Sequence, residues 1–389
     1  MTQVELETQN WLGLLTADEL ANAVAYTQGN HWILVANLAV TLFACALIAR
    51  SRLLSRIVDG LNATKARPNL SALSAAFVFL LALAVMASPF TAFVDWHRER
   101  AFDLSEQPFA DWAVQWALLS VLTALVGALI VAGIYWLVRR TGKNWWVWAS
   151  GLTAAALFVV TFLAPVVLQP LLNTYTPAPE GEVLTAVTEL ADAAGIEAAS
   201  IHLYDGSRQS ERFTANVSGL FGTARIALSD NMFQQGADPA EIRAVVAHEI
   251  GHFVKHHVLV TLVFYSALAG LAFFSTDRLF RAIPWERAGL SVARIEHPGS
   301  FPILYALFTV VMFLATPLTS SYSRLLETSA DRYALELSNE PGGLAQALMR
   351  TANYRAPSPH WLEEMIFYSH PSIERRIGWA MAWKLENHE

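Results

Sequence analysis

The chain has 389 residues, of which 54% are hydrophobic and 15% charged, and its formal net charge is −7. Soluble domains carry about 25% charged residues, so this deficit, concentrated in long apolar runs, indicates membrane spans. The negative charge and the lack of a basic stripe with interleaved aromatic residues argue against a nucleic-acid partner. The single cysteine, Cys45, excludes an intrachain disulfide and a cysteine-based zinc site.

The N-terminal 30 residues contain no Lys or Arg, so they lack the basic start of a signal peptide. Residues 16–26 are predicted to form a short amphipathic helix that leads into the membrane, with Thr16 and Glu19 as a capping box. Six later stretches are apolar enough to cross a bilayer, which needs about 20 residues. They are 32–48, 73–94, 113–138, 146–168, 258–275 and 301–319.

A polar stretch, 169–257, separates the fourth and fifth spans, and a second polar stretch follows the sixth. Apolar periodicity and turn residues predict helices in both, with a small sheet in the first. The expected elements are a turn-rich linker at 173–181, a helix at 183–194, strands at 201–204, around Val217 and at 224–228, a helix capped by Asp238 with Pro239 at its first position, and helices at 321–337, at 344–354 and after His370-Pro371.

The most informative motif is His248-Glu-Ile-Gly-His252, inside the helix that Asp238 caps. Two histidines four residues apart share one face of a helix, with Cβ atoms about 5–6 Å apart, which suits two ligands of one tetrahedral zinc ion. Glu249 is then placed to accept a proton from a metal-bound water, whose pKa falls to about 7. A catalytic zinc site needs a third protein ligand as well.

Glu327 is the best candidate for this third ligand. It lies four residues before Asp331 on a predicted helix, so one carboxylate can bind the metal and the other can accept the free ring N–H of a ligand histidine. This acidic pair makes the alternative, two surface histidines without a metal, much less favoured. His256 lies about 12 Å along the axis from His248, so His256 and His257 are expected at the membrane interface or a chamber wall.

These residues resemble the integral-membrane gluzincin peptidases, which include the type 1 CAAX prenyl proteases and, more distantly, the heat-shock protease HtpX. The resemblance covers about residues 71–389 and is closer to the prenyl proteases, because four spans precede the zinc motif. Besides that motif it rests on Glu327-Thr-Ser-Ala-Asp331, Tyr204-Asp-Gly-Ser207, His370-Pro-Ser-Ile-Glu-Arg-Arg-Ile377, and the segment 93–112 with Glu99.

The resemblance implies one Zn²⁺ per chain and a role for each matching residue. Asp331 would support a ligand histidine, and Arg376 would brace the site by ion pairing. His370 would donate a hydrogen bond to the tetrahedral oxyanion, a contact worth on the order of 3 kcal/mol, although it could also cap the following helix. The implied zinc ligands are His248, His252 and Glu327, and the implied catalytic base is Glu249.

The resemblance also implies that a peptide substrate adds to an edge strand beside the zinc helix. The candidate strand is 215–219, with Ala215 and Asn216 as candidate substrate contacts. The family's asparagine is expected one position away, and such a shift would turn the Asn216 side chain to the other face of the strand. A turn-former entering the strand is the alternative interpretation of Asn216.

The expected fold is a mainly α-helical membrane protein, with about six transmembrane helices around a chamber and a zincin-like α+β domain made of a small sheet and the zinc-motif helix. The prenyl proteases have seven spans. The expected domains are an N-terminal amphipathic segment at 1–30, a four-helix membrane region at 31–172, the first part of the peptidase domain at 173–257, two membrane helices at 258–320 and the second part of the peptidase domain at 321–389.

A multi-pass protein of a bacterial inner membrane is expected, but two arguments about its orientation conflict. Lys and Arg concentrate in the loops after the first, third and fifth spans, so the positive-inside rule places the zinc site outside the cytoplasm. Analogy with the family places it on the cytoplasmic side. The basic loop residues are Arg50, Arg52, Arg56, Lys65, Arg67, Arg139, Arg140, Lys143, Arg278, Arg281, Arg287 and Arg294.

The favoured function is a membrane-embedded zinc metalloendopeptidase in which Glu249 assists the attack of a zinc-bound water. Its expected partners are the lipid bilayer and a peptide or protein substrate. That substrate could be a prenylated C-terminal tetrapeptide or, as for HtpX, misfolded membrane protein. A non-catalytic zinc-binding membrane protein is less favoured, because the spans hold almost no ionisable residues that could form a relay.

Overall fold

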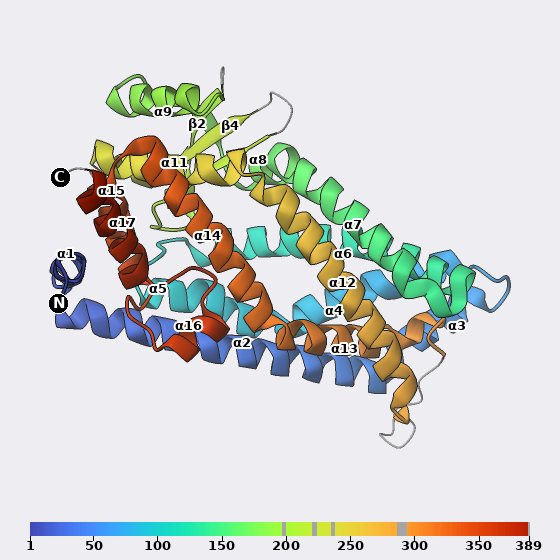
Figure 1. Ribbon diagram of the computed structural model, residues 1–389. Coiled ribbons are helices and arrows are strands. Elements are labelled where there is room, and N and C mark those ends of the chain that lie inside the picture. Colours follow the sequence, from blue (N-terminus) through green and yellow to red (C-terminus); the bar gives the residue numbers. More distant parts are fainter. Residues whose placement is uncertain (197–199, 220–223, 235–237, 286–293, 388–389) are drawn as a thin grey trace.

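The computed structural model describes residues 1–196, 200–219, 224–234, 238–285 and 294–387. Long helices form an elongated bundle with a small sheet at one end (Figure 1). Around that end lie the shorter helices α1 (Gln3–Leu12), α9 (Glu182–Ala193), α11 (Pro239–Val254), α15 (Pro341–Arg350), α16 (Trp361–Phe367) and α17 (Ile373–Asn387).

The first five predicted spans lie in long apolar helical runs. By length and composition, four helices of the described chain could cross a membrane, or five if a bent pair counts as one span. The run Phe109–Leu172 has 64 residues, which is about 96 Å of helix against a bilayer core of about 30 Å. It is a hairpin, because α6 (Phe109–Thr141) and α7 (Trp145–Leu163) pack against each other, so it contains two of the predicted spans. The other runs are α2 (Ala17–Ser51), Pro68–Ala101, which starts with α4 (Pro68–Ala92), and α12 (His257–Ala282).

The sixth predicted span, at 301–319, is bent within its length. Helix α13 (Phe301–Leu314) ends inside it, and α14 (Thr316–Ser338) continues at an angle of 53°. Pro317 stands in the first turn of α14 and has no N–H with which to continue the hydrogen bonds of α13. The bend directs α14 from the bundle toward the sheet (Figure 1).

Two expected domain boundaries fall inside helices. Residue 30 lies within α2, so residues 17–26 are the first turns of the same helix that contains the first span. The capping box at its start is confirmed, because Thr16 N donates to Glu19 Oε2 at 2.8 Å and Glu19 N donates to Thr16 Oγ1 at 3.2 Å. Residue 320 likewise lies within α14.

Within the described residues the sheet has four strands in the order β1–β2–β4–β3, with β2 and β4 parallel and the outer pairs antiparallel. The three predicted strands are confirmed as β2 (Ser200–Tyr204), β3 (Ala215–Ser218) and β4 (Arg225–Ser229). Strand β1 (Tyr175–Pro177) was missed, because its threonine and proline read as a turn. Strand β3 is an edge of the sheet, and buried Ile226 and Leu228 of β4 pack with α9 and α11.

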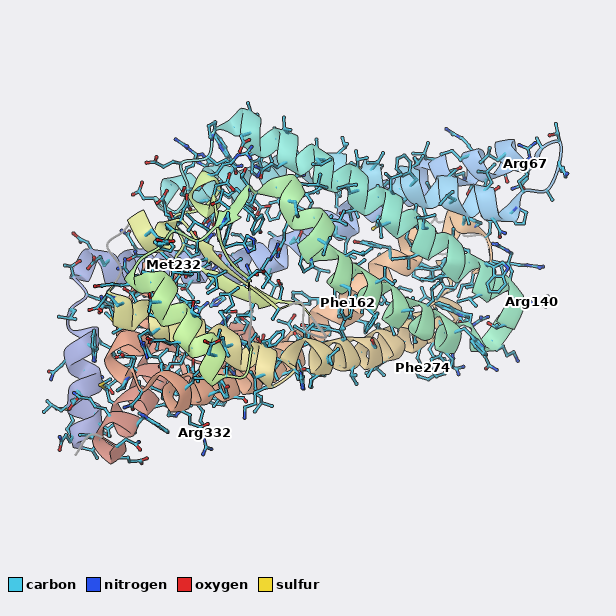
Figure 2. All side chains as sticks on the ribbon, turned by 90° about the horizontal axis from the view of Figure 1, so that it is seen from above. Arg67, Arg140, Phe162, Met232, Phe274 and Arg332 are labelled. Carbon is cyan, nitrogen blue, oxygen red and sulfur yellow. The ribbon has the colours of Figure 1, made fainter. Side chains whose placement is uncertain are left out.

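The long helices place their basic loops at the end of the bundle away from the sheet. In Figure 2, Arg67 and Arg140 lie at one end and Met232 and Arg332 at the other. Helix α3 (Leu53–Asn62) lies at the same end as Arg67. Arg287, part of the third basic loop, lies outside the described residues.

Helix α15 packs directly on the backbone of α11 through Gly343. A Cβ atom at Gly343 would lie 2.2 Å from Ala240 O and 2.5 Å from Ala240 C, whereas one at Gly342 would meet no atom within 4 Å. Arg350, at the other end of α15, forms an ion pair with the fully buried Glu241 of α11. These contacts hold the first turn of α11 in place.

Gly343→Ala should therefore lower the free energy of unfolding by about 1–3 kcal/mol, because the backbones of α11 and α15 must separate. Gly342→Ala is the matched control and should be neutral or stabilising by up to about 1 kcal/mol, since alanine favours helix. Thermal and denaturant unfolding of the detergent-purified variants measures both. Equal stability of the two variants would contradict this packing.

Candidate active site

Helix α11 carries the motif histidines toward α14. Its start is set as predicted, because the Asp238 side chain accepts a hydrogen bond from Ala240 N at 2.9 Å and Pro239 occupies the first turn. A Cβ atom at Gly251 would lie 3.3 Å from both Cα and O of Ala330 in α14. The absence of a side chain at Gly251 therefore lets the two helices approach closely enough for short side chains to meet.

His248, His252 and Glu327 form a cluster whose ligand atoms all lie within 4.8 Å of one another. The Nε2 atoms of the two histidines are 3.1 Å apart. Glu327 Oε2 is 3.3 Å from His248 Nε2, and its Oε1 is 3.5 Å from His252 Nε2. Zn–N bonds of about 2.0–2.1 Å place tetrahedral ligand atoms about 3.3 Å apart. Both the spacing and the donor set therefore fit one zinc ion.

A buried charge network lies behind this cluster. Asp331 Oδ1 is 2.9 Å from His248 Nδ1, the ring nitrogen that faces away from the cluster. Arg376 donates two hydrogen bonds to Asp331, of 2.7 and 2.6 Å, and its Nη2 is 3.9 Å from Glu327 Oε2. Asp331 and Arg376 are both buried. The carboxylate thus compensates the arginine charge and can orient the His248 ring.

Glu249 and His370 face the same cavity as the cluster, which has a volume of ≈ 470 Å³. Burial, partly opposed by attraction to His248, raises the pKa of Glu249 to about 7. His370 Nε2 is 3.4 Å from Glu327 Oε2, and its Nδ1 is 2.9 Å from Ser369 Oγ. Burial and the nearby Arg355 lower the pKa of His370 to about 3, so this imidazole is neutral.

His257 is a site residue that the sequence did not reveal. It was expected at the membrane interface or a chamber wall, but its side chain is buried and its Nδ1 lies 2.9 Å from Nδ1 of His252. The reason is a break between α11 and α12 at His256, whose φ of 54° is left-handed. That turn folds His257 back toward His252, which the spacing of a continuous helix cannot predict.

The edge strand β3 begins beside the cavity, but Asn216 faces away from α11. Ala215 and Val217 pack on the core shared with α11, and side chains alternate along a strand, so Asn216 lies on the opposite face. Its Oδ1 atom is buried and has no hydrogen-bond partner among the described residues. Arg212 and Phe213, which precede β3, line the cavity.

The segment 93–112 also reaches this cavity. Glu99 accepts a hydrogen bond from Arg212 Nη2 at 2.7 Å and one from Tyr26 OH. Leu104 lines the cavity directly. The loop between the second and third spans therefore forms part of the site wall.

Two family models match the chain over nearly its whole length. Residues 177–384 match the model described as peptidase family M48, and residues 8–174 match the one described as CAAX prenyl protease N-terminal, five membrane helices. The second range contains four of the predicted spans, in α2, α4, α6 and α7.

Similar curated proteins include metalloproteases from bacteria and eukaryotes. The metalloprotease YhfN of Bacillus subtilis is 30% identical over 310 residues, 78% of this chain and 72% of that protein. CAAX prenyl protease 1 of Saccharomyces cerevisiae is 32% identical over 243 residues, 57% of this chain and 53% of its own length. The Arabidopsis thaliana homologue of that protease is 28% identical, over 66% of this chain and 60% of its own.

The fold is shared with a solved structure. The crystal structure of Ste24p from S. mikatae superposes with a TM-score of 0.77, at 21% sequence identity, and the match covers 97% of this chain and 95% of that one. Mainly helical architecture, a small sheet and several membrane-length helices are thus confirmed. The chain belongs to peptidase family M48 and is a multi-pass membrane metallopeptidase that acts on peptide or protein substrates.

Proposed function

We propose that the protein is an endopeptidase that holds one zinc ion through His248, His252 and Glu327. The observation that carries this proposal is the spacing of 3.1, 3.3 and 3.5 Å between ligand atoms from two separate helices. When bound, zinc supplies Lewis-acid activation of water and of the substrate carbonyl.

Glu249 is the general base in this proposal. It lies next to His248 and lines the cavity, and its pKa of about 7 lets the carboxylate accept a proton from the attacking water near neutral pH. His370 faces the same space as a neutral N–H donor. A hydrogen bond from its ring would stabilise the oxyanion that forms at the scissile carbonyl.

Asp331, Arg376 and His257 support the two ligand histidines. Asp331 and His257 contact the Nδ1 atoms of His248 and His252, the ring positions not used for the metal. A partner at Nδ1 selects the tautomer and fixes the ring. Arg376 in turn holds Asp331 in place.

The substrate is proposed to be an extended peptide that pairs with the free edge of β3. The edge position of this strand and the cavity residues just before it support this mode. Backbone groups near Ala215 would make the contacts, because the Asn216 side chain faces the other way. The yeast and plant relatives named CAAX prenyl proteases favour lipidated, membrane-bound peptides as the substrate class.

The site is proposed to face the exterior of a bacterial inner membrane. Loops rich in Lys and Arg, which include Arg67 and Arg140, lie at the end of the bundle away from the sheet (Figure 2). The positive-inside rule assigns that end to the cytoplasm.

Replacement of Glu249 by Gln should leave one zinc ion per chain and lower the rate of peptide cleavage at least about 100-fold, the usual loss when a general base is removed. Metal analysis and a quenched fluorescent peptide measure the two effects. Glu336→Gln, a side-chain change on the outer part of α14, is the control. Undiminished cleavage by the Glu249 variant would exclude it as the base, and cleavage after zinc is removed by a chelator would exclude the metal site.

Asp331→Asn should weaken zinc binding by about 10–100-fold, because His248 loses an anionic partner and Arg376 is left buried without its carboxylate. Competition with a chromophoric zinc chelator gives the affinity. Asp192→Asn, at an exposed position on α9, provides the matched change and should retain full affinity.

For orientation, a cysteine in place of Arg332 should react with a membrane-impermeant thiol reagent in intact cells, and one in place of Arg140 should react only after lysis. The native Cys45 is buried and should give little background. The opposite labelling pattern would place the site on the cytoplasmic side.

A further inference from the structure

Within the described chain, four arginines line the active-site cavity, and three of them are neutralised by carboxylates of the protein. The fourth, Arg355, makes no hydrogen bond or salt bridge with any described residue. The three pairs are Arg212 with Glu99, Arg350 with Glu241, and Arg376 with Asp331.

Arg355 stands where two cavities meet. It belongs to the loop between the one-turn helix Thr351–Asn353 and α16, and it is partly buried. Together with Tyr354 and His370 it lines both the active-site cavity and a second cavity of ≈ 370 Å³, which extends to Tyr26 and His31 of α2. A peptide held at His370 would therefore pass beside the Arg355 guanidinium.

Among the described residues, no carboxylate forms an ion pair with Arg355, although Asp103 and Glu211 also line the cavity. A bound zinc ion would offset the negative charge of Glu327 and of the neighbouring Glu249, and Arg376 is paired with Asp331. Burial and then repulsion from Arg376 lower the pKa of Arg355, so the charged guanidinium is less stable here than in water. An anion that enters the cavity would relieve this cost.

We propose that Arg355 binds a carboxylate of the peptide substrate and thereby selects substrates with a negative charge close to the scissile bond. A guanidinium matches a carboxylate with two parallel hydrogen bonds, a geometry that lysine does not reproduce. The carboxylate is the C-terminal one or that of an acidic side chain. This inference rests on the proposed endopeptidase function, because it places the bound peptide at His370.

The test uses the full-length, zinc-loaded protein in detergent and three related fluorogenic peptides of one length. The first ends in a free carboxylate, the second in an amide, and the third in an amide with a glutamate near the scissile bond. A charge-assisted hydrogen bond in a partly buried site should favour a charged peptide about 10–100-fold in kcat/KM. Preference for the first peptide identifies the C-terminus, and preference for the third identifies a side chain.

Arg355→Gln should abolish this preference, so that the ratio of kcat/KM between the charged and the uncharged amide peptides falls to about 1. Arg332→Gln removes the same charge from an exposed position on α14 and should keep the preference. Arg355→Lys should retain part of it. Unfolding temperature and zinc content are measured for each variant. If Arg355→Gln misfolds, the wild type and Arg355→Lys are compared on the three peptides instead. A smaller preference for the charged peptides in Arg355→Lys supports the inference, and an equal preference contradicts it.

Binding separates this inference from the proposed function. The peptides are titrated into protein with Glu249→Gln, alone and combined with Arg355→Gln, so that affinity is read without cleavage. Loss of the carboxylate preference only with Arg355→Gln supports the inference. If the wild type cleaves all three peptides equally well, the role of Arg355 is overturned and the peptidase assignment stands. If the wild type cleaves none of them but still binds the charged peptides more tightly, only the proposed reaction is overturned.

Discussion

The close packing of α11 against α14 is the contact on which the candidate site depends. Gly251 lets the backbones approach at Ala330, and only at that separation can a glutamate on one helix reach two imidazoles on the other. A larger residue at position 251 would have to push the helices apart by some tenths of an ångström. Because metal–ligand distances tolerate changes of only about 0.2 Å, helix packing and metal geometry are a single constraint.

Buried charge is the second feature that organises this region. Arg376, Asp331 and Glu327 are all nearly inaccessible to water, and each lies within 4 Å of an opposite charge or a ligand imidazole. Such groups destabilise a fold when one partner is removed, because the remaining charge is then buried alone. The network therefore couples the stability of α14 and α17 to the geometry of the site. Of the cavity arginines in the described part of the chain, Arg355 alone has no such partner, which is why it points to a ligand outside the protein.

The membrane helices position this site through a bend. Helices α13 and α14 meet at an angle of 53°, so that one runs with the bundle and the other carries Glu327 and Asp331 to the helix of the histidine motif. The loop after the second span contributes Leu104 to the same cavity wall, and its Glu99 holds the cavity residue Arg212. The peptidase region is thus built from segments that the membrane helices separate in the sequence.

The sequence by itself determined everything that depends on local periodicity. Helical spacing places His248 and His252 on one face of their helix, and Glu327 and Asp331 on one face of a second helix. The length of the apolar runs identifies the spans, and turn residues mark the ends of β2, β3 and β4. Only the tertiary structure decided which faces meet. The contact of His257 with His252 depends on a left-handed turn at His256. The lack of an ion pair at Arg355 among the described residues depends on which carboxylates reach the neighbouring arginines. These are long-range relations set by packing of the whole chain, and no pattern in neighbouring residues encodes them.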